Sequence, residues 1–314
     1  MNEFEFIDEI NKIKNYHKIN LAIGDDTAIL NENMLICSDS LVEGIHFSLD
    51  YFSIAEAVEK AIIINLSDIL AMNGRALQYL LNISIPKTEL KNLKAVISSI
   101  KKINEKYSID LIGGDTTSSL KDIFISVTMI GESKSPVKRN GAKSGDNIYI
   151  GGLPGKSSLA MHLLQTTSTS LSKHKDKLRY KKYHISPEIN FKFLELFKEI
   201  KPNSMIDISD GLLSDLSHIL KASKLGAEID ESTLNKDETF NLLARKYNLN
   251  PLNLIYNGGE DFIPLFTSPE SPQKVKTLAD KLGLSLICVG KLTDGNSIKN
   301  KSGEILDAKG FKHF

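Results

Sequence analysis

The chain contains two cysteines, no tryptophan, and no excess of charge of either sign. Cys37 and Cys288 are too few for a disulfide framework and favour a reducing compartment. Lysine plus arginine and aspartate plus glutamate both number 39, so nothing in the charge predicts a nucleic-acid-binding surface. The apolar runs are shorter than a membrane span, and the acidic start MNEFEFIDEI lacks the features of a signal peptide. These absences predict a soluble cytoplasmic protein with no membrane or nucleic-acid partner.

The length of 314 residues exceeds what one hydrophobic core usually supports. Serine, lysine and proline interrupt the pattern at 133–137, so we expect one domain over 1–136 and a second over 137–314. Strand-like and helix-like segments alternate along the chain, which predicts an α/β fold. Helices are expected at 6–13, 53–72, 88–107, 187–200, 211–220, 240–247 and 272–282, and strands at 28–30, 34–36, 76–85, 123–130, 147–150, 227–229 and 284–289. The polar stretch 165–183 is expected to be a mobile or solvated connection, with or without a short helix, and a terminal hairpin ends in GFKHF.

Acidic residues gather in the stretch from Gly24 to Phe47. Asp25, Asp26 and Asp39 fall within two short extended segments, and His46 closes the stretch. Carboxylates crowded at strand ends repel one another, so a fold that gathers them usually holds a cation between them.

The helix expected next contains a further acid. Ser53 and Glu56 form a capping box at its start, and its second half is apolar on nearly every side. Asn65 and Asp68 share one face of this buried half. Taken alone, Asp68 is interpreted as a satisfied buried group that bonds a neighbouring loop.

Three later segments combine glycine with acids. In LIGGDTT, Asp115 and two threonines suit phosphate and metal, although a glycine hairpin turn is the alternative. In MIDISDG, Asp207 lies on a strand, and Ser209 or Asp210 caps the following helix. In NGGEDF, Glu260 follows two glycines at the head of a strand.

The segment GGLPGKSS looks like a P-loop, but its spacing is one residue short of that pattern. It is therefore a weak phosphate-loop candidate, and a plain glycine turn is the better interpretation.

The acids without nearby thiols or paired histidines favour a hard cation, and the glycine loops with hydroxyls favour phosphate. Together they indicate magnesium holding a nucleotide. Phosphoryl transfer needs mainly positioning and charge neutralisation, so no catalytic nucleophile is assigned. Arg139 and Lys143 are the nearest basic candidates.

An ordered set of motifs resembles the thiamine-monophosphate kinase family. The motifs cover nearly the whole chain: GDDTAIL, SDSLVEGIHF, NLSDILAMNG, LIGGDTTSS, KRNGAKSGDNIYI, MIDISDGLLSDL, NGGEDF and GFKHF. The resemblance implies ATP- and magnesium-dependent phosphorylation of thiamine monophosphate to thiamine diphosphate by direct transfer. It also implies two α+β domains of the aminoimidazole ribonucleotide synthetase-like fold, which selenophosphate synthetase shares, and a homodimer formed through strands of the first domain.

The resemblance also implies roles for individual residues, motif by motif. Several magnesium ions would be held by Asp26, Ser38, Asp39, Asp68, Asp115 and Asp207, with Asp210 on a further ion. ATP would contact Tyr107, Gly114, Asp115, Arg139 and Ser209. Thiamine monophosphate would contact His46 and Glu260, and Phe311 would either stack on its ring or pack internally. Asp25 and Asp261 are expected to be structural neighbours.

The chain departs from the family pattern at three places. Cys37 replaces a small hydroxyl residue, Lys156 replaces an acid, and His184 with Ile185 replaces Arg-Pro. Two other functions remain open at this point. One is a sister enzyme of the same fold with a different phosphate acceptor, and the other is a nucleotide-binding regulator without catalysis. Against the sister enzymes, the chain lacks the early reactive cysteine of selenophosphate synthetases and the terminal cysteine of hydrogenase maturation proteins. Against the regulator, clustered acids that take part in no reaction would repel one another at a cost in stability.

Overall fold

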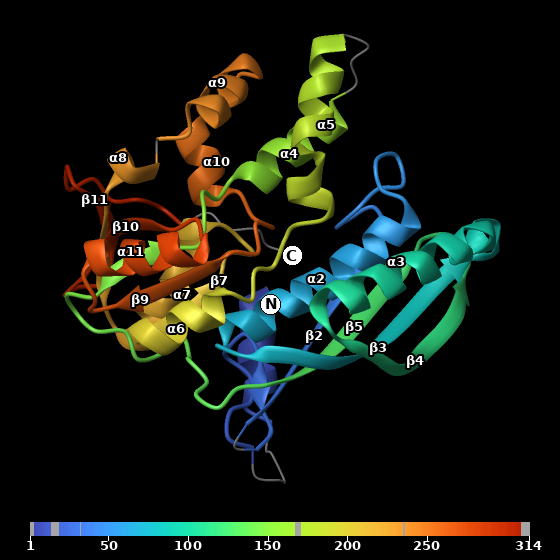
Figure 1. Ribbon diagram of the computed structural model, residues 1–314, viewed down its shortest axis with the longest axis horizontal. Coiled ribbons are helices and arrows are strands. Elements are labelled where there is room, and N and C mark those ends of the chain that lie inside the picture. The colour runs from blue at the N-terminus through green and yellow to red at the C-terminus, as the bar shows by residue number, and fades with distance from the viewer. Residues whose placement is uncertain (1–2, 14–18, 32, 167–170, 235, 309–314) are drawn as a thin grey trace.

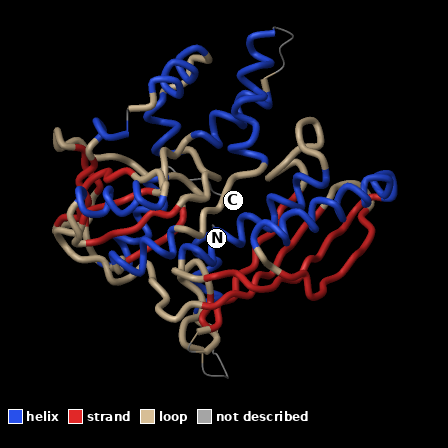
Figure 2. Tube along the Cα trace, in the orientation of Figure 1, coloured by secondary structure: helices blue, strands red, loops and turns tan. Residues whose placement is uncertain are grey.

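The structure is a computed structural model that describes residues 3–13, 19–31, 33–166, 171–234 and 236–308. Two β-sheets form two separate groups of strands, one on each side of the molecule (Figure 2). Helix α2 (Ile54–Ala71) packs on the first sheet and also contacts two strands of the second (Figure 1). The two sheets are therefore joined through one shared helix.

The first sheet has five strands in the order β1-β2-β5-β3-β4, all antiparallel except the β3–β4 pair. Its elements are β1 (Ala28–Ile29), β2 (Met34–Val42), β3 (Arg75–Pro86), β4 (Asp110–Ser119) and β5 (Phe124–Glu132). Buried and partly exposed side chains alternate along β5, as expected for a sheet with one covered face. Helices α2 and α3 (Leu93–Tyr107) cover that face (Figure 1). A 3₁₀ helix η1 (Lys87–Asn92) precedes α3, and α1 (Glu3–Asn11) begins the described chain.

The predicted start of α2 is confirmed. The Glu56 amide donates to Ser53 Oγ, and the Ser53 amide donates to Glu56 Oε2 at 2.8 Å, which completes the capping box. The helix is buried along most of its length, including the polar side chains of Lys60 and Asn65. A buried helix of this kind can carry polar groups into the centre of the molecule, where each needs a partner.

The second sheet has six strands in the order β11-β8-β10-β6-β9-β7. Its strands are β6 (Asn147–Ile150), β7 (Ser204–Asp207), β8 (Gly226–Ile229), β9 (Pro264–Ser268), β10 (Ile287–Thr293) and β11 (Ile298–Asn300). Its helices are α4 (Lys156–Gln165), α5 (Leu171–Ile185), α6 (Phe193–Ile200), α7 (Leu212–Ser223), α8 (Glu231–Leu234), α9 (Glu238–Lys246), α10 (Pro251–Asn257) and α11 (Pro272–Leu282). The core under α6 and α11 is continuous with that of the first sheet, whereas α4 and α7 cover a separate core.

Several local predictions were wrong. The stretch 165–183 contains most of α5, whose Tyr180 is buried, because a lysine- and arginine-rich segment with spaced aromatic residues favours a helix over a loop. The LIGGDTT glycines lie inside β4 and form no turn. The helix expected from residue 187 begins at Phe193, and α8 and α10 were not predicted. The terminal GFKHF, residues 310–314, lies outside the described residues.

No helix in the described part of the chain combines the length and apolarity needed to cross a membrane.

Candidate functional site

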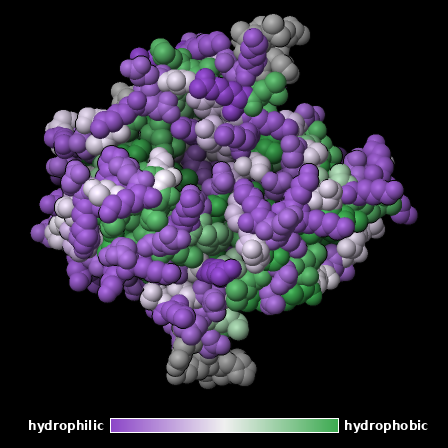
Figure 3. Space-filling model, in the orientation of Figure 1, coloured by the Kyte–Doolittle hydropathy of each residue, from purple (hydrophilic) through white to green (hydrophobic). Residues whose placement is uncertain are grey.

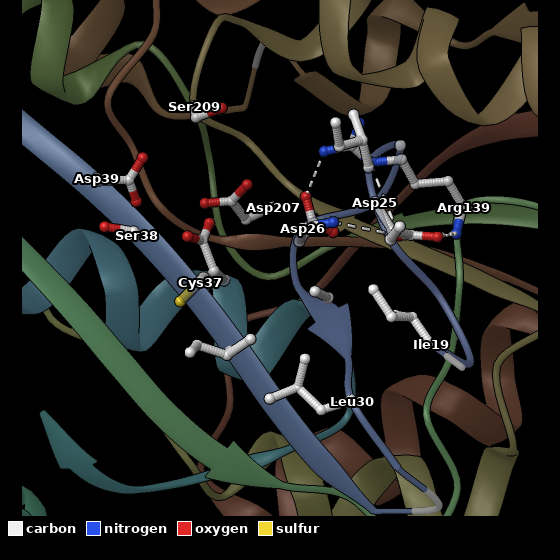
Figure 4. Close-up of a pocket in the computed structure, with 16 residues that line it drawn as sticks. Ile19, Asp25, Asp26, Leu30, Cys37, Ser38, Asp39, Arg139, Asp207 and Ser209 are labelled. Carbon is white, nitrogen blue, oxygen red and sulfur yellow. Dashed lines mark hydrogen bonds and ion pairs between the residues drawn. The ribbon is translucent and has the colours of Figure 1, made fainter. Parts of the chain in front are cut away.

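A cavity of about 530 Å³ lies where the two sheets meet. Its walls come from the 19–39 segment, α2, Arg139 and the end of β7, and Figure 4 shows how the labelled side chains converge. Five aspartates line it: Asp25, Asp26, Asp39, Asp68 and Asp207. Ser38 on β2 and Ser209 after β7 also line it. The structure thus brings together the acids of four separate motifs, including Asp68, which the sequence alone favoured as a local hydrogen-bonding group.

Three of these acids could hold a metal ion. Carboxylate oxygens of Asp26, Asp68 and Asp207 all lie within 4.8 Å of one another. The Oδ2 atom of Asp26 is buried and has no hydrogen-bond partner among the described residues. Hard cations such as Mg²⁺ take oxygen ligands of this kind, so the donor set fits magnesium.

Burial makes the negative charge of this cluster costly. Burial, followed by the charges of Asp39 and Asp207, raises the pKa of Asp68 well above its ordinary value. Burial and the charge of Asp26 raise the pKa of Asp207 to about 7, and burial also raises the pKa of Asp39. A cation at this position would remove that cost, because an opposite charge favours the ionised form.

Arg139 supplies the permanent positive charge in the cavity. Its Nη2 donates to Asp26 Oδ1 at 2.6 Å, and its backbone amide donates to both carboxylate oxygens of Asp25 at 3.2 Å. Asp25 therefore positions Arg139, as expected for a structural neighbour. Burial and the charge of Asp26 raise the pKa of Asp25 to about 6 despite this contact.

Two buried side chains hold the end of β7 and the loop that follows it. Ser67 on α2 donates its hydroxyl hydrogen to Asp207 Oδ2 at 2.6 Å. Asp215, inside α7, accepts the amide hydrogens of Ser209, Asp210 and Gly211 at 3.0 to 3.1 Å with one oxygen. The expected cap at Ser209 or Asp210 is therefore wrong: Gly211 is the N-cap, and Asp215 holds the loop from inside the helix.

A second cavity of about 560 Å³ adjoins the first. Asp39 and Ser209 line both cavities, so the two share a wall. Six apolar or aromatic side chains line the rest of it: Leu41, Ile45, Tyr51, Ile64, Met161 and Phe262. Polar side chains also line it: Ser40, His46, Ser158, Gln165, Asp210, Asn257 and Glu260. A cavity that combines an apolar wall with several polar groups suits a small organic molecule.

His46 combines a local hydrogen bond with a place in the second cavity. The Val42 amide donates to its Nδ1 at 3.0 Å, which fixes Nδ1 as an acceptor and places the ring hydrogen on Nε2. The local hydrogen bond and the binding role were alternatives in the sequence. The structure shows the local hydrogen bond and places His46 in the lining of the second cavity, and the binding role stays a prediction.

Three predicted site residues, Gly114, Asp115 and Tyr107, are not brought to the cavities within one chain. Asp39 pairs with Val127, Val127 with Leu81, and Leu81 with Gly114. Gly114 and the exposed Asp115 are therefore three strand spacings, about 14 Å, across the sheet from Asp39. Tyr107 lines a different cavity, where its hydroxyl accepts from the Ile189 amide, and Phe311 lies outside the described residues.

Close packing explains the glycine at position 114 without a ligand. Its φ is +141°, and a Cβ there would lie 1.8 Å from the Leu81 carbonyl oxygen. Any side chain would push β4 away from β3.

The GGLPGKSS loop is a capped helix start and offers few amides to phosphate. Asp261 Oδ2 accepts from the Gly155 amide at 2.6 Å, and its Oδ1 accepts from the Ser157 amide at 3.1 Å. Lys156 pairs with Asp237 at 3.1 Å. The glycine-turn interpretation is therefore favoured, and Asp261 is a structural residue, as expected.

Comparison with known proteins identifies the family. Residues 24–133 match the family model "AIR synthase related protein, N-terminal domain", and residues 143–301 match the corresponding C-terminal domain. The thiamine-monophosphate kinase of Buchnera aphidicola subsp. Schizaphis graminum is 37% identical over 100% of this chain and 99% of its own length. That of Bacillus subtilis is 31% identical over 100% of both chains. This chain belongs to the thiamine-monophosphate kinase family.

A solved structure supports the same assignment and fold. The structure described as "AaThiL complexed with AMPPCP and TMP" is 28% identical, with a TM-score of 0.86, and the match covers 100% of this chain and 97% of that one. The predicted two-domain fold of aminoimidazole ribonucleotide synthetase type is confirmed.

Within the thiamine-monophosphate kinase family pattern, Cys37 is the departure nearest the acids. Its Sγ lies 3.5 Å from Asn65 Oδ1, and burial followed by the Asp68 charge raises the pKa of the thiol well above its ordinary value. A thiol that stays protonated is a poor metal ligand, so the neighbouring Ser38 is the better donor.

Sequence reasoning missed three residues whose side chains contact the site: Lys60 pairs with Glu260, Ser67 bonds Asp207, and Asp215 bonds the loop after β7. Each is a buried polar side chain within a helix. The signal available was a polar residue at a position where the helix pattern is otherwise apolar.

Proposed function

We propose that this chain catalyses the ATP-dependent phosphorylation of thiamine monophosphate to thiamine diphosphate, with magnesium. The observation that carries the proposal is the pair of adjoining cavities that share Asp39 and Ser209. One holds clustered carboxylates and an arginine, and the other combines an apolar wall with several polar side chains. AMPPCP is an ATP analogue, and its presence with TMP in the related structure supports this pair of substrates.

The first cavity would hold the metal and the ATP phosphates. Magnesium would be bound by Asp26, Ser38, Asp39, Asp68 and Asp207, and a further ion by Asp210 in the second cavity. Bound magnesium would neutralise charge on the transferred phosphoryl group. Arg139 and Ser209 would contact the ATP phosphates, while Asp25 keeps Arg139 in place.

The second cavity would hold the acceptor. His46 would donate from Nε2, and Glu260 would present a carboxylate. Asp39, on the shared wall, lies where the acceptor phosphate and the ATP phosphate would meet. Transfer in this arrangement needs positioning and charge neutralisation, and no side-chain nucleophile is assigned.

We further propose a homodimer in which a second copy supplies Gly114 and Asp115. Every residue from Asp110 to Thr117 on the edge strand β4 is exposed, including Leu111 and Ile112. Figure 3 shows apolar surface gathered over this part of the first sheet, at the lower right. An exposed apolar edge strand is a template for pairing with another chain. The partner's β4 would bring its Asp115 to the metal site that this chain's own Asp115 cannot reach, and Tyr107 of either copy would contact the nucleotide.

The proposed localisation is the cytoplasm, which rests on the low cysteine content.

The test is product formation by the purified protein with ATP, thiamine monophosphate and Mg²⁺. ADP release is measured together with thiamine diphosphate by chromatography, with controls that lack the acceptor or the metal. We expect product that depends on both. A protein that binds ATP with magnesium but makes no thiamine diphosphate would point to a sister activity with another acceptor.

A further inference from the structure

Lys60 is a lysine with a fully buried side chain in the middle of α2. The helix residues that follow it, Ala61 to Ile64, are apolar, and its ammonium lies 5.5 Å from the centre of the Phe52 ring. Burying a charged ammonium is costly unless a specific partner compensates it. The reason for a lysine at this position must therefore be the group that it faces.

That group is Glu260, which lines the second cavity. Lys60 Nζ lies 2.9 Å from Glu260 Oε1, and His184 Nδ1 lies 3.2 Å from Glu260 Oε2. The two partners come from opposite parts of the fold, since Lys60 is on α2 and His184 is at the end of α5. Within the described residues, Nζ of Lys60 meets no other hydrogen-bond acceptor, and Nε2 of His184 has no partner. Both buried groups are thus aimed at one carboxylate.

The contacts also define the charge of each member. Nδ1 of His184 lies 3.2 Å from both Ser157 Oγ and Glu260 Oε2, so a hydrogen on Nδ1 can be shared between two oxygens. Burial lowers the pKa of the His184 imidazole, which leaves the ring neutral with a bare Nε2. Burial opposes ionisation of Glu260, but Lys60 and His184 outweigh it and lower its pKa to about 2. The three groups together are electrically neutral.

The backbone of Glu260 requires such support. Its φ is +61°, in the left-handed region that side-chain-bearing residues rarely adopt. The Glu260 amide donates to the Ser209 carbonyl at 2.7 Å, which ties this turn to the wall shared by the two cavities. A side chain on a strained turn keeps one direction when buried partners hold its end.

We infer that Lys60 and His184 are positioning residues that hold the Glu260 carboxylate in a fixed direction in the second cavity. The fixed carboxylate is an anionic hydrogen-bond acceptor, and it selects a substrate that carries a cationic or N–H-donating ring. The inference rests on the proposed function, because it assigns this cavity to the phosphate acceptor. The Glu260 side chain is 29% exposed and lines the second cavity, so it remains available to a ligand while Lys60 and His184 hold its two oxygens. Because Lys60 and His184 already hold the Glu260 carboxylate, it presents its charge in the right direction without rearranging when the ligand enters.

The experiment compares steady-state kinetics of the full-length protein and four variants. Lys60→Met removes the ammonium while keeping the length of the side chain. His184→Leu removes the ring nitrogens, whereas His184→Asn keeps an N–H donor close to the position of Nδ1. Lys274→Met is the matched control, because it removes a lysine from an exposed pair with Glu270 at 2.7 Å.

We expect the KM for thiamine monophosphate to rise about tenfold or more in Lys60→Met and His184→Leu, the effect of losing one charge-assisted hydrogen bond. The KM for ATP should change by less than about twofold. His184→Asn should restore most of the acceptor affinity, and Lys274→Met should behave as the wild type. An unchanged acceptor KM in both Lys60→Met and His184→Leu, or equal rises for ATP and acceptor, would overturn the inference.

A double-mutant cycle tests whether Lys60 acts on the acceptor through Glu260, and it remains informative if Lys60→Met alone folds poorly. If Lys60 acts through Glu260, adding Lys60→Met to Glu260→Gln should change the acceptor KM little further, and the double variant avoids an unpaired buried carboxylate. Additive effects would contradict the inference.

Calorimetric titration of the acceptor in the presence of AMPPCP gives the same comparison without turnover. A wild-type protein that binds thiamine monophosphate but makes no product would refute the proposed function alone, and the variants would still test the roles of Lys60 and His184. A wild-type protein that does neither would refute both.

Discussion

The buried carboxylate of Asp215 predicts a large and specific effect of mutation. One of its oxygens accepts the amide hydrogens of Ser209, Asp210 and Gly211 at 3.0, 3.1 and 3.1 Å. Asp215→Ala removes this acceptor and leaves three amides unpaired, of which that of Gly211 belongs to a buried residue. No other helix-capping bond replaces it, because Gly211 as N-cap has no side chain.

The size of the effect follows from the number and kind of hydrogen bonds lost. A hydrogen bond to a charged group contributes about 1.5–3 kcal/mol, and an unpaired buried amide costs about 1–3 kcal/mol. Three bonds that share one oxygen are not additive, so we expect Asp215→Ala to lower the free energy of unfolding by about 3–5 kcal/mol. For a chain of this size that corresponds to a fall in Tm of about 10 °C.

Asp215→Asn is the matched control, since it keeps an oxygen in the same place and removes the charge. Burial, with the charges of Asp207 and Asp210, raises the pKa of Asp215 well above its ordinary value. Removing a charge that is costly to bury offsets the weaker hydrogen bonds, so this variant should lose about 1 kcal/mol or less. Thermal unfolding followed by circular dichroism and Mg²⁺ titration measure both variants. If Asp215→Ala unfolds within about 2 °C of the wild type and binds Mg²⁺ normally, the carboxylate does not hold the loop.

Four further outcomes are expected. Asp39→Asn should abolish turnover and raise the Tm of the metal-free protein, because it relieves repulsion in the cluster; a normal rate in the assay would contradict the metal assignment. The raised pKa values of Asp25 (about 6) and Asp207 (about 7) mean that the folded protein keeps protons that the unfolded chain releases. The stability that these two carboxyl groups contribute to the metal-free protein is therefore full below about pH 4 and lost as the pH rises to about 7, and Mg²⁺ should raise the Tm more at pH 8 than at pH 5 in a thermal-shift series. Ser67→Ala should weaken Mg²⁺ binding about tenfold in calorimetry, because it removes the 2.6 Å bond to Asp207, and unaltered affinity would exclude that role. Asp115→Asn and Asp39→Asn should each be inactive alone, yet regain part of the activity after co-refolding, and no recovery would argue against a shared site.

The local rules of the sequence predict individual elements better than they predict the site. The capping box at Ser53 and Glu56 depends on residues three apart, and it is formed as expected. The loop before α7 follows a different rule, because its acceptor is Asp215, which comes after the amides that it binds. Side chains that reach backwards from within a helix cannot be told from ordinary polar positions by spacing alone.

The convergence of the acids depends on strand order, which the sequence does not show. Asp39 and Asp115 each lie on a strand beside hydroxyl side chains, and both were predicted to be magnesium ligands. In the fold, β5 and β3 separate their strands, so one acid faces the cavity and the other lies on the sheet edge. Similar local motifs therefore do not show whether two acids meet within one chain.

Helix α2 explains why two domains can hold one site in register. Ser67 bonds Asp207 in the acid cavity, and Lys60 pairs with Glu260 in the adjoining one. The two residues are seven positions apart, two helical turns on nearly the same face, and about 10 Å apart at a rise of about 1.5 Å per residue. Asp68, next to Ser67, adds a carboxylate of the same helix to the metal cluster. Because one rigid helix bonds the second domain at both cavities, a movement of that domain that opened one cavity would strain the contact in the other. The separation between the acid cluster and Glu260 is therefore set by the rise of the helix, and the loops around the cavities can vary without changing it.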